Sequence, residues 1–296
     1  MPQSLVLNLV AQSAIPLRHL QGYSLQQLFF DLVDAVDPAL GRVLRRDKRN
    51  ESYGLSALQV QSESVPYLRS LKAPDPSKRP TLQYTHNNTL NPQTRCWWRI
   101  SLLDDALLDH LAQKWTHLQN NTFQLGTASV SLLSIATDTH TAAWAGSCSY
   151  SDLYERASSH NHDIHLQFVT PTTFEQNGGT TPLPTADAVF QPLRKSWNRH
   201  SPLAFTPSLL SDIRPTDFDI QTRTVHSIRK NSLQTITGCT GQISFRIGNH
   251  SDSLIIKRIN TLADFTQYCP IGFNTRLGMG VVKRLKTSQA NISIKA

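Results

Sequence analysis

The sequence has little cysteine, and none of it is arranged as a metal or redox site. Four cysteines occur among 296 residues, and no two stand in the Cys-x-x-Cys spacing of zinc sites and thiol redox couples. Thiols in a reducing compartment are therefore expected. No apolar run reaches the roughly 18 residues that span a bilayer, and the N-terminus lacks the basic and apolar regions of a secretion signal. These absences favour a cytoplasmic protein that does not cross a membrane.

The motifs of nucleotide cofactors and of metal-dependent nucleases are also missing. No Gly-Lys-Ser or Gly-Lys-Thr ends a phosphate loop, and the glycine-rich stretch near the C-terminus leads into an expected strand, where a dinucleotide fingerprint needs a helix. His162 and His165 would point to opposite faces of a strand, without further ligands at the usual spacing. The aspartates at 104–105 and 217–219 are typical of a helix start and a strand edge. We therefore expect no cofactor and no metal.

Acidic residues are outnumbered by basic ones. The sequence contains 21 Asp and Glu against 29 Lys and Arg, which gives a formal net charge of +8 and a pI near 9.5, with 11 histidines besides. A positive surface attracts polyanions, so this balance favours a phosphate-rich partner such as nucleic acid. Net charge carries no information on the fold.

The chain is long enough for two domains, each with its own core. In the first half, apolar residues alternate or recur at helical spacing, with Ser24 as the expected N-cap of the first helix and Trp98 as a core residue. The expected elements of this half are strand 4–11, helix 24–36 with a continuation to 44, strand 53–60, strand 96–103, helix 104–117, and a strand or hairpin over 123–136.

The second half repeats this order of elements. Its expected elements are strand 164–169, helix 187–200, strands 218–229 and 237–247, helix 259–268, and strand 281–285. This is the ferredoxin-like order, in which an antiparallel sheet carries two helices on one face. We therefore predict an α+β protein with tandem ferredoxin-like (RRM-like) domains at 1–140 and 141–296. No close repeat of residues relates the two halves, so the prediction rests on element order.

The stretch Cys269–Gly280 is a glycine-rich loop before the last expected strand. Glycines let backbone N–H groups approach a polyanion closely, and neighbouring cations neutralise it. The same glycines would also suit a loop that only turns the chain from a helix into a strand, and both interpretations stay open. The candidate polyanion-binding residues of this region are Gly272, Arg276, Gly278, Gly280 and Lys283.

Two further basic groups lie on or beside expected helices. The group around the end of the first helix comprises Arg42, Arg45, Arg46, Lys48 and Arg49. Cations there also complement a helix C-terminus, so a purely structural role is open. The group on the helix 187–200 comprises Arg194, Lys195, Arg199 and His200. These side chains cannot all share one face, and both contacts with RNA phosphates and a solvated face are open for them.

The loop Gly272–Gly280 and the stretch Leu166–Phe174, followed by Pro182–Pro184 and a helix with Leu193–Asn198, form a recognisable pair. Together they resemble the CRISPR repeat-processing endoribonucleases of the Cas6 family. The resemblance implies two ferredoxin-like domains that bind the CRISPR repeat of a precursor crRNA in a basic cleft and cut it once without metal. It implies attack of a ribose 2′-hydroxyl on the adjacent phosphate, which leaves a 2′,3′-cyclic phosphate. The implied partners are this RNA and a CRISPR effector complex, with the protein as a monomer or homodimer.

Arg45 stands where many members of that family carry their catalytic histidine. Arginine stabilises negative charge but stays protonated, so it is a poor proton shuttle. His19 is the nearest substitute in sequence, with Tyr23 close by, although an ordinary loop histidine is an open interpretation too. The resemblance leaves His19, Tyr23, Arg45 and Lys48 as candidate catalytic residues.

Three alternatives remain open at this point. Without a proton carrier, the protein would hold the RNA for in-line attack while Arg or Lys side chains stabilise the transition state. It would otherwise be a cleavage-inactive homologue that retains or delivers crRNA, a hypothesis that Arg45 favours. A backbone subunit of an RNA-guided complex would use the same module in several copies along one RNA.

Overall fold

The computed structural model describes residues 1–46, 52–61, 82–104, 110–176, 178–229 and 232–285. The chain divides into two compact units, here called the first and the second unit. The first contains Met1–Ser147 and, far along the sequence, Arg276–Gly278; the second contains Cys148–Thr275 and Met279–Ala296. The tip of the glycine-rich loop therefore belongs to the first unit. None of the described helices combines the length and hydrophobicity that crossing a bilayer requires.

The first unit is built on an antiparallel sheet with the strand order β2-β4-β1-β6-β5. Its strands are β1 Gln3–Ala11, β2 Tyr53–Leu55, β4 Arg95–Leu102, β5 Thr122–Leu125 and β6 Ala128–Ala136, with the short strands β3 Gln59–Val60 on β4 and β7 Gly146–Ser147 on β1. The strand expected over 53–60 is thus divided in two. A strand or a hairpin was expected over 123–136, and the structure has a hairpin there, formed by β5 and β6.

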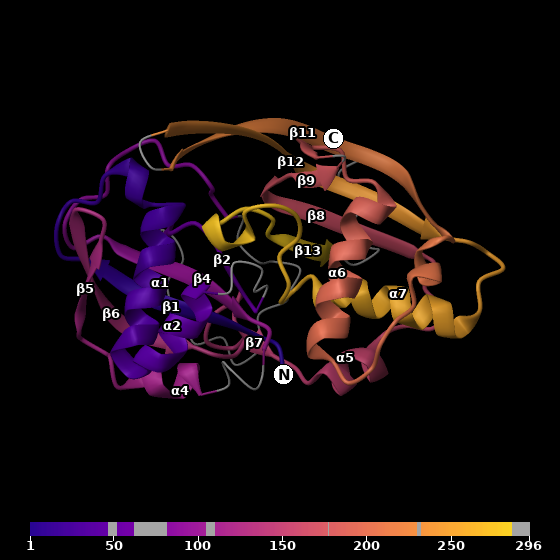
Figure 1. Ribbon diagram of the computed structural model, residues 1–296, viewed down its shortest axis with the longest axis horizontal. Coiled ribbons are helices and arrows are strands. Elements are labelled where there is room, and N and C mark those ends of the chain that lie inside the picture. Colours follow the sequence, from indigo (N-terminus) through magenta and orange to yellow (C-terminus); the bar gives the residue numbers. More distant parts are fainter. Residues whose placement is uncertain (47–51, 62–81, 105–109, 177, 230–231, 286–296) are drawn as a thin grey trace. The chain divides into compact units, whose positions relative to one another are not determined.

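Helices pack on this sheet to form the core of the first unit (Figure 1). They are the short turn η1 Leu17–His19 and the helices α1 Tyr23–Val36, α2 Pro38–Arg46 and α4 Leu111–Thr116. Trp98 is fully buried, as predicted. Trp115 joins α4 to α1, because its indole N–H donates to the Leu32 carbonyl at 2.9 Å and its ring meets the edge of Phe29. Residues 105–109 of the helix expected over 104–117 lie outside the described residues.

The predicted N-cap of α1 is wrong. The helix begins at Tyr23, and Gly22 takes the N-cap position with a φ of +74°, a conformation that glycine adopts without strain. The Ser24 hydroxyl instead bonds to the ring of His19. The prediction failed because a serine before an apolar run is a cap signal, but here a longer-range partner takes its hydroxyl.

The second unit has the strand order β11-β12-β8-β13, again antiparallel. Its strands are β8 Asp163–Thr172, β11 Ile213–Arg229, β12 Ser232–Ile247 and β13 Val282–Leu285, with a separate hairpin of β9 Phe174–Gln176 and β10 Gly179–Thr181. Its helices are α5 Tyr150–Arg156, α6 Ala186–His200 and α7 Ser253–Phe265, with the short turn η3 Pro207–Leu210. A further short turn, η4 Thr275–Leu277, lies in the glycine-rich loop.

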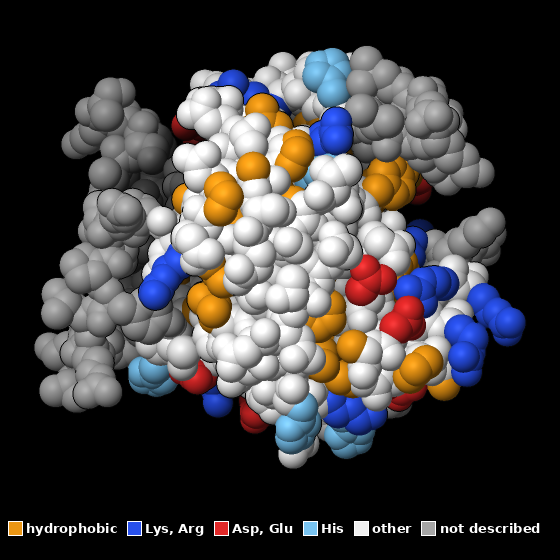
Figure 2. All heavy atoms as spheres, turned by 90° about the vertical axis from the view of Figure 1, so that its left-hand side faces the viewer, with side chains coloured by type: hydrophobic (Ala, Val, Ile, Leu, Met, Phe, Trp, Pro, Cys, Tyr) orange, Lys and Arg blue, Asp and Glu red, His pale blue; other side chains and the backbone are white. Residues whose placement is uncertain are grey.

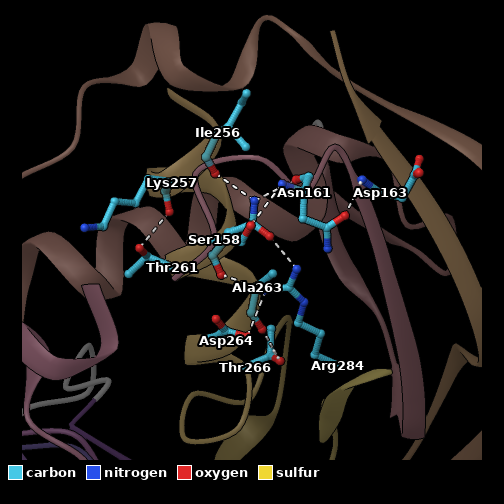
Figure 3. Close-up of polar contacts among 11 residues, drawn as sticks. Ser158, Asn161, Asp163, Ile256, Lys257, Thr261, Ala263, Asp264, Thr266 and Arg284 are labelled. Carbon is cyan, nitrogen blue, oxygen red and sulfur yellow. Dashed lines mark hydrogen bonds and ion pairs between the residues drawn. The ribbon is translucent and has the colours of Figure 1, made fainter. Parts of the chain in front are cut away.

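Helix α7 differs from the predicted range of 259–268. It starts at Ser253, behind Asp252, whose side chain accepts from the Leu254 N–H at 3.2 Å. On its far side, Arg284 of β13 points toward the end of α7, where it donates to the Asp264 carboxylate at 2.8 Å (Figure 3). Since α7 precedes the glycine-rich loop and β13 follows it, this ion pair fixes both ends of the loop.

Candidate active site

A buried tyrosine collects charged and polar side chains in the first unit. Tyr53 of β2 is 1% exposed, and its ring stacks on Phe29 with centroids 4.3 Å apart. Its hydroxyl accepts a hydrogen bond from Gln26 Nε2 at 3.3 Å and is also bonded by Arg276. The guanidinium carbon of Arg276 lies 5.7 Å from the ring centroid. Tyr53 therefore holds the arginine of the glycine-rich loop.

Arg45, on the last turn of α2, is held from two sides. Its Nη1 donates to Asp34 Oδ1 at 2.9 Å and its Nη2 to Asp34 Oδ2 at 2.5 Å, a bidentate pair with both side chains about one third exposed. Its guanidinium carbon lies 4.6 Å from the ring centroid of Phe30. The hydrogen bond from Arg45 lowers the pKa of Asp34. Arg45 is thus a cation of fixed orientation.

Both arginines act electrostatically on the Tyr53 hydroxyl. Burial raises the pKa of Tyr53, while the hydrogen bonds from Gln26 and Arg276 and the charges of Arg276 and Arg45 oppose that rise. The net upward direction keeps the phenol protonated at neutral pH. Arg45 packs on Phe30, whose ring meets that of Tyr53 with centroids 6.2 Å apart, and Arg276 packs on Tyr53 itself. Planar guanidinium groups placed in this way are suited to phosphate oxygens.

Backbone contacts fix the loop tip that carries Arg276. The Leu277 carbonyl accepts from the Gly22 N–H at 3.3 Å and from the Tyr84 hydroxyl at 3.5 Å. Gly278 has a φ of +98°, and a Cβ there would lie 3.0 Å from the Ala57 backbone nitrogen. Arg276 is therefore presented by a tightly packed turn.

The remainder of the glycine-rich loop, in the second unit, is hydrogen-bonded to the end of β8 and the residue after it. The Phe273 N–H donates to the Thr173 carbonyl at 2.8 Å, and the Gly280 N–H to the Pro171 carbonyl at 3.1 Å. A Cβ on Gly272 would lie 2.3 Å from the Thr173 carbonyl oxygen. The N–H groups of Phe273 and Gly280 are thus occupied by carbonyls at or just after the end of β8, so contacts with a polyanion fall to side chains and to the tip.

His19 is buried and bonded through both ring nitrogens. Its Nε2 lies 3.2 Å from Arg18 Nε and 3.3 Å from the Thr127 backbone nitrogen, and both of these groups only donate. Nε2 therefore accepts, and Nδ1 carries the proton in its 2.7 Å bond with Ser24 Oγ. Gly126 packs against the ring, since a Cβ there would lie 2.2 Å from it. His19 is thus a neutral residue that joins the start of α1 to the β5–β6 turn.

Two family models match the chain. The CRISPR Cas6 N-terminal domain matches residues 1–155, and the CRISPR-associated endoribonuclease Cas6 matches residues 166–282. The chain belongs to the Cas6 family. This confirms the resemblance carried by the glycine-rich loop and the strand over 166–174.

Solved Cas6 structures share the fold of this chain. A Cas6 product complex is 23% identical with a TM-score of 0.73, and the match covers 96% of this chain and 100% of that one. A Thermus thermophilus Cas6 structure gives 22% identity and a TM-score of 0.67 over 96% and 98% of the two chains. A second Cas6 product complex is 20% identical with a TM-score of 0.67, and the match covers 96% of this chain and 99% of that one. Identities of this size establish the two-domain α+β fold alone. No curated protein matches the chain.

The other predicted basic residues of this Cas6-family chain differ in their surroundings. Arg194 of α6 donates to the Phe205 carbonyl at 3.0 Å and to the Gln191 side chain, so it braces the segment after its own helix. Lys195 and Arg199 on the same helix are exposed. Lys283 of β13 is buried at 8% exposure.

The candidates around the start of α1 and the end of α2 are partly described. Arg46 is exposed at the end of α2, and Tyr23 is 36% exposed at the start of α1. Lys48 and Arg49 lie outside the described residues. The structure thus brings Arg45 and Arg276 to two adjoining aromatic rings, Phe30 and Tyr53, and places His19 in a hydrogen-bonded environment of its own.

The positive side chains are unevenly distributed on the face shown in Figure 2. On the face shown in Figure 2, Lys and Arg gather at the lower right among Asp and Glu side chains, whereas the centre is largely uncharged. Among the described residues, no group of three or more His, Cys, Asp or Glu side chains could hold a metal ion. His162 and His165 bond instead to the Ile247 carbonyl and the Ser244 hydroxyl.

Sequence reasoning missed Asp34, Tyr53 and Gln26. A signal existed for one of them, because Asp34 and Arg45 stand on either side of the Asp37–Pro38 break between two helices. A sharp turn between two helices brings residues on either side of it together, as the bonds between Arg45 and Asp34 show. Tyr53 gave no signal beyond its place in a short apolar strand.

The surroundings of His19 predict a pH effect on stability. Burial, followed by the charge of Arg18, lowers the pKa of His19 from its ordinary value of 6.5. The unfolded chain takes up this proton near pH 6.5 and the folded chain only at lower pH, so stability should fall as the pH drops below 6.5. The loss should be smaller in His19→Gln, because glutamine does not titrate. Urea denaturation at several pH values checks this, and equal pH slopes in both proteins would contradict it.

Proposed function

We propose that the chain is a metal-independent endoribonuclease that binds CRISPR repeat RNA and cleaves precursor crRNA, by 2′-hydroxyl attack that leaves a 2′,3′-cyclic phosphate. The observation that carries the proposal is that the guanidiniums of Arg45 and Arg276 pack on the adjoining rings of Phe30 and Tyr53, in a chain of the Cas6 family. Attack of a 2′-hydroxyl on its phosphate builds up negative charge on the phosphorane. Two fixed cations stabilise that charge without a metal ion.

The catalytic roles divide between charge stabilisation and proton transfer. Arg45 and Arg276 take the first role, with Lys48 as a further cation from the predicted set. Tyr23, exposed at the start of α1, is the candidate proton carrier that RNA reaches directly. His19 takes this role only where RNA binding opens its bonds with Arg18 and Thr127, because Nε2 accepts from both. In-line positioning of the RNA and charge stabilisation then supply most of the rate enhancement.

Both units are proposed to contribute residues that bind RNA. The first unit holds the catalytic region, and the second holds most of the glycine-rich loop. The proposed RNA-binding residues are Arg46, Arg49, Arg194, Lys195, Arg199, Gly272, Arg276, Gly278, Gly280 and Lys283. Within this set, Gly272 and Gly280 contribute by shaping the loop, because the Gly280 N–H already donates to the Pro171 carbonyl. Support comes from similar structures described as a substrate mimic complex and as a protein binding different RNA substrates. Delivery of the product to a CRISPR effector complex, by a monomer or homodimer, belongs to the same proposal.

We also propose that each unit is ferredoxin-like (RRM-like). In the second unit, β8, β11, β12 and β13 are the four strands in chain order, with α6 after the first and α7 after the third. Their order in the sheet, second-third-first-fourth, is that of the ferredoxin-like sheet. In the first unit β1, β2, β4 and β6 have the same order, with β5 added beside β6.

The test of the proposed function is a cleavage assay on a repeat RNA from the same locus, in EDTA. We expect one cut, at a rate equal to that in magnesium, and a 5′ product that ends in a 2′,3′-cyclic phosphate by mass spectrometry. A shuffled RNA of the same composition is the control and should stay intact. Cleavage that requires magnesium, or a 3′-hydroxyl product end, would contradict the proposal.

A second candidate function is a cleavage-inactive homologue that retains or delivers crRNA. Arg45 favours it, because an arginine in a bidentate pair with Asp34 takes the position at which many family members carry histidine. Tight binding of the repeat without any cut in the same assay would select this function.

A further inference from the structure

We propose that Asp34 is the positioning residue of the active site, which orients the guanidinium of Arg45 toward the scissile phosphate. This role rests on the proposed function and assigns a task to a side chain that does not itself contact the RNA. Asp34 lies on α1 and Arg45 on α2, eleven residues later. The two oxygens of Asp34 receive Nη1 and Nη2 of Arg45 side by side, at 2.9 and 2.5 Å.

The ring of Phe30 completes the orientation. Phe30 precedes Asp34 by one helical turn on α1, and its centroid lies 4.6 Å from the guanidinium carbon of Arg45. The pairing through Nη1 and Nη2 fixes the group within its own plane, and the aromatic ring fixes the tilt of that plane. The Nε–H and the outer hydrogens of Nη1 and Nη2 are not used by Asp34. A phosphate can therefore bind Arg45 while Asp34 stays in place.

Gly41 in α2 is the strongest sign that this arrangement is built into the fold. A Cβ at position 41 would lie 1.7 Å from Asp34 Oδ1 and 3.1 Å from Arg45 Nη1. Glycine weakens a helix interior relative to alanine, and Gly41 has an ordinary helical backbone that alanine would also adopt. Because glycine has no side chain, there is room at this point for the Asp34 carboxylate. The ion pair with Arg45 is thus accommodated by a residue with a lower helix propensity than alanine.

The charge of Asp34 and its geometry have opposite consequences for the reaction. A carboxylate near the RNA repels phosphates, so it weakens binding. The same carboxylate fixes the direction of the Arg45 fork, and a small displacement of a catalytic group slows the chemical step. Removal of the charge should therefore tighten RNA binding and slow cleavage at the same time. If Asp34 had a purely structural role, its loss would both weaken RNA binding and slow cleavage.

Three variants of the full chain separate these effects. Asp34→Asn keeps the shape but removes the charge and the bidentate pair. Asp31→Asn is the matched control, since Asp31 lies on the same helix, acts on Arg45 only through its charge, and otherwise bonds to Gln27. Gly41→Ala retains every charge and displaces the Asp34 carboxylate.

The measurements are single-turnover cleavage of the repeat RNA in EDTA, its Kd by filter binding, and the thermal midpoint of each variant. Asp34→Asn should slow cleavage by about tenfold or more while the Kd falls by about twofold. Asp31→Asn should lower the Kd to a similar degree, with cleavage within about twofold of wild type. Gly41→Ala should slow cleavage by about tenfold at an unchanged Kd.

The following outcomes would contradict the proposed positioning role of Asp34. Equal cleavage rates for Asp34→Asn and Asp31→Asn would show that only charge matters. Weaker binding, slower cleavage and a lower thermal midpoint together in Asp34→Asn would assign it to folding. A wild-type chain that binds but does not cut removes the proposed function, and the role of Asp34 with it, whereas wild-type cleavage with unaffected variants removes the role alone.

Discussion

A repeat RNA with a single 2′-deoxy substitution at the cut site should bind normally and resist cleavage. The substitution removes the nucleophile of the proposed reaction and leaves the phosphate and the neighbouring bases unchanged. We expect cleavage to slow by at least about a thousandfold, which corresponds to roughly 4 kcal/mol of added barrier. Denaturing gel electrophoresis of single-turnover reactions in EDTA measures the effect.

A second RNA with the deoxy substitution one nucleotide downstream is the control. It loses one hydroxyl as well, so it should bind equally and be cut at close to the normal rate. Rapid cleavage of the RNA that is deoxy at the cut site would mean that water is the nucleophile. That result would leave the family assignment intact and remove 2′-hydroxyl attack, with its 2′,3′-cyclic phosphate product, from the mechanism.

The order of elements was predictable because each element carries its own periodic signal. Helix α6 begins one residue before its predicted start, and β11 and β12 extend beyond the two strands predicted at 218–229 and 237–247. Burial of Trp98 followed from strand alternation alone. Patterns of this kind depend on neighbours in the sequence, and they survive folding because the same faces meet the core.

The candidate site was only partly predictable because its contacts join distant segments. Arg276 was selected for its charge and its glycine neighbours, but its packing on Tyr53 joins residues more than 200 positions apart. His19 was selected as a proton carrier, although its bonds with Ser24 and Thr127 give it a structural task in the free chain. Local sequence supplies candidates by residue type, and only the fold decides which partners each side chain has.

The glycine-rich loop shows the same limit, since its spacing predicted a loop but not the task of each glycine. Gly280 has a φ of +78°, and a Cβ there would lie 2.0 Å from the Ile271 carbonyl oxygen. The backbone N–H of Ile271 donates to the Gly280 carbonyl at 2.8 Å, so the two backbone segments are in direct contact. Gly178 has nearly the same φ of +79°, yet a Cβ there would meet nothing within 4 Å. A side chain at position 178 would meet only backbone strain, whereas a side chain at position 280 would meet both strain and a steric clash.

Gly280→Ala should therefore be far more damaging than Gly178→Ala. Both substitutions add the strain of a positive φ, about 1 kcal/mol, but only Gly280→Ala also forces two backbone segments apart, at a further cost of about 1–3 kcal/mol. Because Gly280 closes the loop that carries Arg276, we expect a weaker affinity for the repeat RNA as well as a lower urea midpoint. Gly178→Ala should change the midpoint slightly and the affinity not at all. Equal losses in the two variants would mean that the loop accommodates a side chain at position 280, and that its closure does not set the position of Arg276.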